Sequence, residues 1–200
     1  GADVYKGQVP TSGGGGVYEF AINVDGGTYA ISGSLSSIST PLSSGYSFSN
    51  QTRANQNYYS YVMGSRIQFL TAGTVVAIGA QNRYGATMAL YPDTDNTAVA
   101  TVTIEGTNSS STTRNYRYTT LTTPVSVAAN SIYRVALKNS TGGYAYHYIN
   151  SYIGTPTASG NIKLLGGAYS YVGRYSSITR PTNNVTSINY GSTDLIFLPS

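Results

Sequence analysis

The chain repeatedly alternates apolar and polar side chains at a period of two residues. From Val17 to Val24 every second side chain is large and apolar, and the same alternation returns from Thr28 to Leu35. Asp25-Gly26-Gly27 stands between the two runs, and Gly adopts the positive φ angles of a tight hairpin turn at little cost. No window places apolar residues at helical spacing behind a capping residue. The pattern predicts an all-β chain with a hairpin over 17–35.

Further strands are expected at short intervals along the rest of the chain. They are predicted near 58–70, 74–80, 85–91, 98–105, 115–121, 131–138, 144–150, 161–165, 168–172 and 193–198. Many short strands separated by turn signals are typical of a sandwich or jelly roll. We therefore expect an antiparallel β-sandwich of jelly-roll character, preceded by an N-terminal strand and hairpin extension.

One predicted strand, Ile132–Lys138, shows the alternation most clearly. The side chains expected to face the core are Tyr133, Val135 and Leu137, and those expected to face out are Arg134, Ala136 and Lys138. Thr123-Pro124 and Ala129-Asn130 are expected to break the chain before this strand.

The predicted organisation has three parts. Residues 1–16 form an N-terminal arm that combines a candidate strand with the run Gly13–Gly16, a composition typical of a flexible tether. Residues 17–49 form the hairpin extension, and residues 50–200 form the sandwich domain. The C-terminal segment from Leu195 to Leu198 is apolar without alternation, so both of its faces are expected to be buried.

The charge of the chain is low and dispersed. Charged residues make up 9% of the sequence, against about 25% in an average soluble domain. The 11 Lys and Arg residues are scattered singly, whereas nucleic-acid binders gather cations on one face, so we expect no nucleic-acid partner. No stretch approaches the roughly 18 apolar residues of a membrane helix. The chain begins with Gly1, which we interpret as the product of signal-peptide or tag removal.

A series of short sequence segments, in a fixed order, resembles a known family. These segments are Val62–Phe69, Gly73–Ala80, Ala89–Asp93 with Ala98–Val102, Leu121–Tyr133, and Gly166–Tyr169. In this order they resemble a recurrent jelly-roll-like, carbohydrate-binding-module-like β-sandwich of secreted bacterial surface proteins, over about residues 58–197. Asn130 stands where that family usually has Gly, and Asn also tolerates positive φ. The resemblance implies a fold and an extracellular setting, with no catalytic residue.

The residues available for catalysis or metal binding are few. Asp93 and Asp95 lie in an expected turn, where Asp commonly caps its own backbone. The same turn offers oxygen ligands for Ca²⁺, although it departs from the EF-hand pattern. His147 is the only histidine, and no cysteine is present. We expect no enzyme activity and no cofactor, with calcium at Asp93 and Asp95 as the open alternative.

Two groups of residues are candidates for modification or binding. Sequons at Asn50, Asn108, Asn139 and Asn184 are candidate glycosylation sites, although chance alone accounts for their number. Tyrosines gather in three clusters, of which Tyr144, Tyr146 and Tyr148 are the candidate binding aromatics, because Tyr combines apolar area with a polar tip. Alternation in a strand explains half of each cluster equally well.

The leading functional hypothesis is a non-catalytic extracellular protein that assembles with itself. It would be a subunit of a filament, pilus-like or surface assembly joined by β-strand addition, as in donor-strand complementation. The candidate donor residues are Val4, Tyr5 and Val9 in the arm and Leu195 and Phe197 at the C-terminus. The alternative is a carbohydrate-binding or adhesive module that binds cell-surface polysaccharide, and a phage tail or fibre domain is a third hypothesis.

Overall fold

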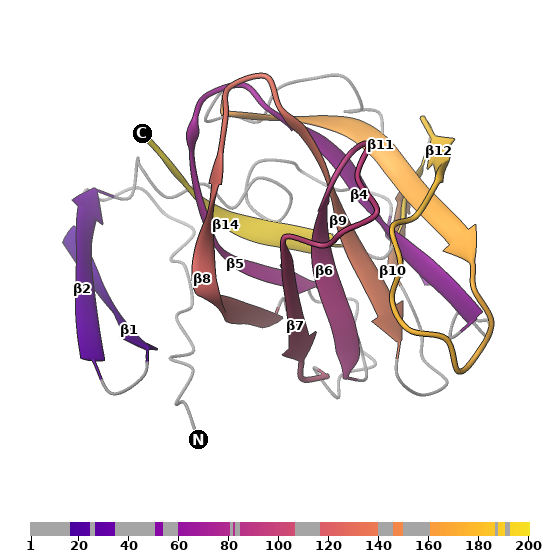
Figure 1. Ribbon diagram of the computed structural model, residues 1–200, viewed down its shortest axis with the longest axis horizontal. Helices are drawn as coiled ribbons and strands as arrows, with labels where there is room; N and C mark the ends of the chain where they lie inside the picture. Colours follow the sequence, from indigo (N-terminus) through magenta and orange to yellow (C-terminus); the bar gives the residue numbers. More distant parts are fainter. Residues whose placement is uncertain are drawn as a thin grey trace.

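The computed structural model describes the backbone of residues 17–24, 27–34, 51–53, 60–80, 82, 85–106, 117–139, 146–149, 161–186, 188–190 and 193–200. Within these ranges the chain is built from antiparallel strands, as the sequence predicts (Figure 1). Side chains are described for most of these residues from 60 onward.

The largest sheet has six strands, which lie in the order β12-β11-β4-β9-β6-β7. Their bounds are Asn183–Val185 for β12, Ile162–Tyr171 for β11, Tyr61–Phe69 for β4, Ile132–Asn139 for β9, Ala86–Pro92 for β6 and Ala100–Ile104 for β7. Arg134 lies opposite Arg66 on β4 and opposite Tyr91 on β6. These three side chains therefore form one row across the sheet.

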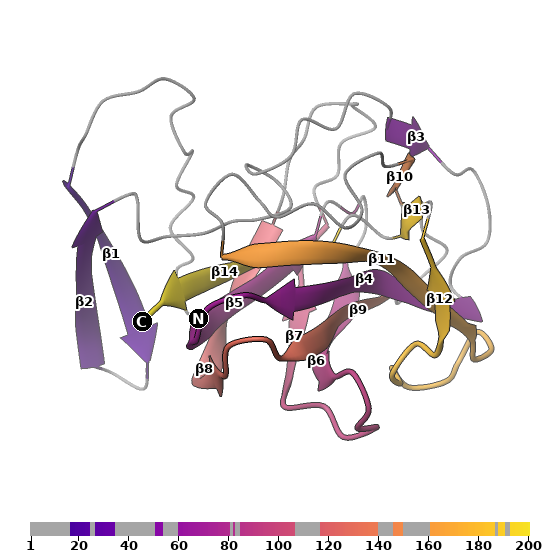
Figure 2. The same cartoon turned by 90° about the horizontal axis from the view of Figure 1, so that it is seen from above.

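A second sheet contains three strands in the order β14-β5-β8. They are β14 (Thr193–Pro199), β5 (Gly73–Ala80) and β8 (Arg117–Val127). One face of this sheet packs against one face of the six-stranded sheet, and the two layers are visible from above in Figure 2. Their shared core includes Phe69, Ile78, Leu137 and Phe197, each fully buried, and the Phe69 and Phe197 ring centroids are 4.9 Å apart.

A polar contact also joins the two layers. The Ser65 amide of β4 donates to Thr193 Oγ1 of β14 at 3.1 Å, and the two hydroxyl oxygens lie 2.7 Å apart. Both residues are fully buried. Since a buried polar group is costly without a partner, this pairing lets two hydroxyls enter the core and fixes β14 over β4.

The remaining strands form two small sheets. β1 (Val17–Val24) and β2 (Gly27–Ser34) pair with each other from Val17↔Ser34 to Val24↔Gly27, which confirms the predicted hairpin. β10 (Tyr146–Ile149) lies between β13 (Ile188–Tyr190) and β3 (Gln51–Arg53). The three-residue strands β3, β12 and β13 were not predicted from the sequence, because a segment this short carries no measurable alternation.

Two predicted boundaries were wrong. The segments 161–165 and 168–172 form a single strand, β11, with a bulge between Leu164 and Gly166, where Gly166 has a φ of 133°. The expected break at Thr123-Pro124 lies inside β8, opposite a register shift between Val75 and Ala77. β8 is at the edge of its sheet, and an irregular edge strand tolerates the missing N–H of Pro124. The turn at Asn130 is confirmed, with a φ of 64°.

The outer face of β9 is also different from the prediction. Arg134, Ala136 and Lys138 were expected to face solvent, but they are 4%, 0% and 5% exposed. A second apolar cluster on this face joins Ala136 to Val62, Ala89 and Tyr91, with Val172 and Ile178 packed against it. The segment that follows β11 therefore covers the side of the sheet that alternation alone assigns to water.

Candidate functional site

We define the strap as residues 172–182, the segment between β11 and β12 that crosses the outer face of the six-stranded sheet. At its start, the amides of Val172 and Gly173 donate to the Ser60 carbonyl at 2.9 and 3.1 Å. At its end, the Thr182 amide donates to Ser170 Oγ at 2.8 Å. The strap is thus fixed to the sheet at both ends.

Three side chains of the sheet hold the strap through its carbonyl groups. Lys138 Nζ donates to the Arg174 carbonyl at 3.2 Å, Tyr91 Oη donates to the Ile178 carbonyl at 3.3 Å, and Arg134 donates to the Pro181 carbonyl at 2.5 Å. Irregular backbone has no ladder to satisfy its carbonyls, so it needs side-chain donors when it lies on a protein surface. This requirement explains why long polar residues occupy positions facing the strap.

Asp93, in the turn after β6, is the centre of a charged network at one end of the strap. Its two carboxylate oxygens accept from Arg66 Nε at 2.8 Å and from a terminal Arg66 nitrogen at 2.7 Å, and Oδ1 also accepts from Arg134 Nε at 2.8 Å. Arg180 of the strap donates to the Asp93 carbonyl at 2.6 Å and to Asn96 Oδ1 at 2.9 Å. The network ties β4, β9, the turn and the strap together.

The network shifts the pKa values of its members in different directions. The hydrogen bonds from Arg66 hold the pKa of the Asp93 carboxyl below its usual value, aided by the charge of Arg134 and opposed by burial. The hydrogen bond to Asp93 raises the pKa of Arg66. Burial lowers the pKa of Arg134, whose side chain is 5% exposed against 25% for Arg66. Arg134 is therefore the less hydrated of the two guanidinium groups, and its charge depends more on the Asp93 carboxylate for stabilisation.

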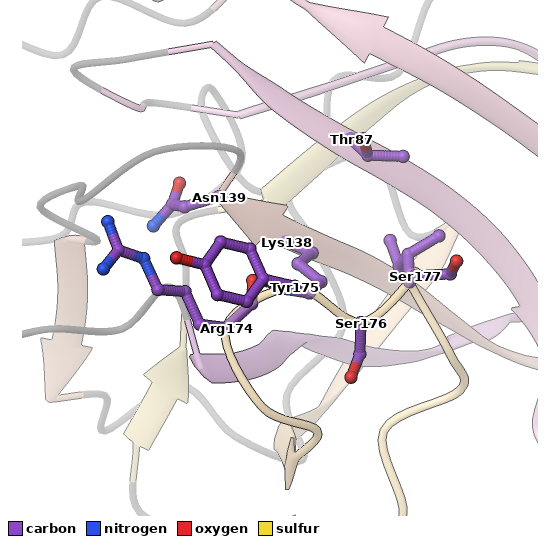
Figure 3. Close-up of a pocket in the computed structure, with 8 residues that line it drawn as sticks. Thr87, Lys138, Asn139, Arg174, Tyr175, Ser176 and Ser177 are labelled. Atoms are coloured by element: carbon purple, nitrogen blue, oxygen red, sulfur yellow. Dashed lines mark hydrogen bonds between the residues drawn. The ribbon is translucent and has the colours of Figure 1, made fainter.

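An open hollow of about 250 Å³ lies at the other end of the strap, where it passes over the ends of β6 and β9 (Figure 3). Its lining consists of Thr87, Lys138, Asn139, Arg174, Tyr175, Ser176, Ser177 and Ile178. Two of these eight side chains are cationic, none is anionic, and most of the others carry a hydroxyl or amide. The hollow is therefore polar and positively charged.

Exposed aromatic rings lie at the rim of this hollow and just before the strap. Tyr175 is 90% exposed and Tyr171 is 70% exposed. The Arg174 guanidinium lies 5.3 Å from the centroid of the Tyr175 ring, and Figure 3 shows the two side chains next to each other. In the described part of the chain, Val99 is the only other large apolar side chain that is strongly exposed, at 44%. The two exposed tyrosines each combine apolar area with a polar tip, which suits a contact surface.

The predicted strand-addition residues have different fates. Val4, Tyr5 and Val9 lie outside the described residues. Leu195 and Phe197 are fully buried in β14, where they pair with Ile78 and Val75 of the same chain. The C-terminal strand is thus occupied within its own sheet, and Ile196 and Leu198 on its second face are only half-buried.

The other predicted residues are distributed as follows. Asn50, Asn108 and Tyr144 lie outside the described residues, and only the backbone of Tyr146, His147 and Tyr148 is described, in β10. Asn184 is exposed in β12. Asn139 is 1% exposed, so the folded chain does not present this sequon to a glycosylating enzyme. The exposed residues Tyr171 and Tyr175 belong to a third tyrosine cluster, which also contains Tyr169. This cluster was not selected from the sequence, because alternation cannot separate exposed from covered positions.

The carboxylates proposed for calcium have other partners. Asp93 is engaged by two guanidinium groups, and Asp95 Oδ1 accepts from the Thr97 amide at 2.8 Å, as expected for a turn Asp. Among the described residues no cluster of three or more His, Cys, Asp or Glu side chains could hold a metal ion. This arrangement gives calcium binding at the turn no support.

Comparisons of the chain with protein-family models, with curated proteins and with solved structures find no match. Within the described residues, no helix has the length and apolar character to cross a membrane.

Proposed function

We propose that this chain is a non-catalytic extracellular β-sandwich of jelly-roll character that binds carbohydrate through the surface around the strap. The proposal rests on one observation, the exposure of Tyr175 at the rim of a polar hollow, with Tyr171 also exposed just before the strap. Sugars present apolar ring faces rimmed by hydroxyl groups. An exposed tyrosine offers a matching apolar face, and the hollow offers hydroxyl, amide and ammonium groups for the rim.

The rigidity of the strap supports this proposal. Both of its ends and three of its carbonyl groups are bonded to the sheet, so the aromatic rings emerge from a fixed base. A preorganised surface loses less conformational entropy on binding than a free loop does. The facing sheets with one shared core support the sandwich architecture.

Affinity electrophoresis through gels containing soluble polysaccharides, followed by calorimetry with oligosaccharides, tests this function. We expect retardation by at least one polysaccharide, with binding weakened about tenfold by Tyr175→Ala, as for a central interface tyrosine. Val99→Ala is the control, since Val99 is an exposed apolar residue that does not line the hollow. If the Tyr175→Ala and Tyr171→Ala proteins bind the polysaccharide as tightly as the unaltered protein does, the two rings do not contact sugar.

A subunit of a filament or surface assembly is the second candidate. It is favoured by the position of β14 at the edge of the order β14-β5-β8, where no described strand pairs with its second side. A strand from a neighbouring copy can pair with such an edge by main-chain hydrogen bonds. Negative-stain electron microscopy of the protein and of a variant lacking residues 1–16 tests it. Filaments that vanish on truncation support addition by the arm, and discrete monomers in both samples exclude it.

A further inference from the structure

At the end of the strap that lies against the turn after β6, three guanidinium groups surround one carboxylate. The Asp93 carboxylate is bonded to Arg66 and Arg134. Arg180 instead donates to the Asp93 carbonyl and to Asn96 Oδ1, which are both neutral oxygens. Burial lowers the pKa of Arg134, and the charges of Arg180 and Arg66 lower it further against the opposing effect of the carboxylate. Positive charge therefore exceeds negative charge at this end of the strap.

Two of these guanidinium groups keep donors for a ligand. A guanidinium has five N–H donors, and the bonds of Arg66 and of Arg180 each use Nε and one terminal nitrogen. Neither residue is buried, and none of their nitrogen atoms is both buried and without a partner. The second terminal nitrogen of each group therefore meets solvent, where it can donate to the oxygens of an anion.

Lys163 of β11 adds a further positive charge on the same face of the sheet. It pairs with Gln68, which lies two residues from Arg66 on β4, and residues that are two apart or directly opposite share one face. Lys163 is half-buried, and its side chain has no hydrogen bond or ion pair with the described residues. The other carboxylate in the turn is that of Asp95, which is exposed and caps the Thr97 amide. Four cations thus stand against two carboxylates, which favours an anionic ligand.

The strap connects this cationic end to the exposed Tyr175 ring. Tyr175 lies five residues before Arg180, so their Cα atoms are at most about 18 Å apart. Ser176, Ser177 and Thr179 are exposed between them. The surface of the strap therefore runs from an aromatic ring, over hydroxyl groups, to a group of cations.

We propose that an anionic polysaccharide binds along the strap, with an anionic group at Arg66, Arg180 and Lys163 and a sugar ring against Tyr175. This inference rests on the proposed carbohydrate-binding function and names its ligand class. A chain of several sugar units fits better than a single sugar, because the ring and the cations lie at different ends of the strap. Carboxylates and sulfate esters share the oxyanion chemistry with which a guanidinium pairs.

Calorimetry with three hexasaccharides tests the proposal: one of galacturonic acid, its methyl ester, and one of galactose carrying sulfate esters. We expect an anionic hexasaccharide to bind about tenfold more tightly than the ester at about 20 mM salt, with a smaller difference at about 300 mM, because salt screens exposed charges. The tighter of the two anionic probes identifies the anion as carboxylate or sulfate. Galacturonic acid itself should bind much more weakly than its hexasaccharide, and equal affinities would contradict binding along the strap.

Variants separate a specific site from attraction by net charge. Lys163→Gln removes a charge without breaking a side-chain contact in the described part of the chain, so it should weaken binding of the anionic hexasaccharide and leave the ester unaffected. Arg180→Gln should weaken it more, about tenfold, with thermal denaturation as the check that the strap stays folded. Arg117→Gln removes the same charge from β8 in the other sheet and should bind as the unaltered protein does. If Lys163→Gln and Arg117→Gln weaken binding equally, the site at the strap is refuted.

The outcomes distinguish this inference from the function beneath it. Equal binding of the anionic hexasaccharides and the ester, sensitive to Tyr175→Ala, would refute the anionic ligand and leave the binding function standing. No binding of any polysaccharide or hexasaccharide would overturn both.

Discussion

Replacing Asp93 by Asn tests whether the charged network holds the strap on the sheet. The substitution keeps the size of the side chain but removes the charge that three guanidinium hydrogen bonds of 2.7–2.8 Å share. Arg134 is then left 5% exposed with no carboxylate partner, whereas Arg66, at 25%, recovers hydration. Breaking a buried pair by removing one partner costs roughly 3–5 kcal/mol. Arg134 keeps its bond to the Pro181 carbonyl, so we expect the lower end, about 3 kcal/mol.

The assay is urea unfolding, supported by thermal denaturation. A loss of about 3 kcal/mol corresponds to a fall in Tm of roughly 6–12 °C for a chain of this size. Asp95→Asn is the matched control, because Asp95 is exposed in the same turn and Asn keeps the oxygen that caps Thr97. We expect it to change stability by less than about 0.5 kcal/mol. The double variant Asp93→Asn, Arg134→Met should recover part of the loss. If Asp93→Asn and Asp95→Asn lower the free energy of unfolding by the same amount, the network does not hold the strap.

Three further predictions concern the pH dependence of stability and the packing of the two sheets. Because the pKa of Asp93 is lowered in the folded chain, its contribution to stability is complete above the ordinary carboxyl pKa of about 4 and is lost as the pH falls through the folded value; acid titrations of unfolding should show this loss, and the Asp93→Asn protein should lack it. Gly64→Ala places a Cβ 1.9 Å from the Val135 carbonyl oxygen, so thermal denaturation should show a loss of about 3 kcal/mol or more, against about 1 kcal/mol or less for Gly85→Ala, whose Cβ would meet its nearest atom at 3.2 Å. Phe197→Ala should cost about 3–5 kcal/mol in urea unfolding, and a cost below about 1 kcal/mol would show that β14 does not contribute to the core.

The sequence determined much of the secondary structure. Alternation and turn residues located the hairpin β1–β2, the strands β4, β5, β6, β7, β9 and β14, and the turn at Asn130, because each depends on a few consecutive residues. The limits of β8 and β11 were missed, since a strand continues through Pro124 or Gly166 only when a neighbouring strand supplies the bulge that accepts it.

The candidate site was not predicted from the sequence. Arg66, Asp93, Arg134 and Arg180 are far apart in the chain and carry no local motif, so only the register of β4, β9 and β6 brings them together. The hollow has the same origin, because Thr87, Lys138 and Arg174 come from three different segments. The abundance of tyrosine suggested a binding surface, but the particular exposed rings could not be selected.

The outer face of β9 shows where local pattern and tertiary structure separate. Alternation states that Tyr133 and Arg134 point to opposite faces, and this holds in the structure. It does not state what lies over each face. The strap, some forty residues further along the chain, covers the second face and turns Arg134 and Lys138 into buried residues that hold its carbonyls. The sequence alone therefore determined the strands and their two faces, whereas the covering of the second face was decided by packing between distant segments, because burial is a property of the whole fold.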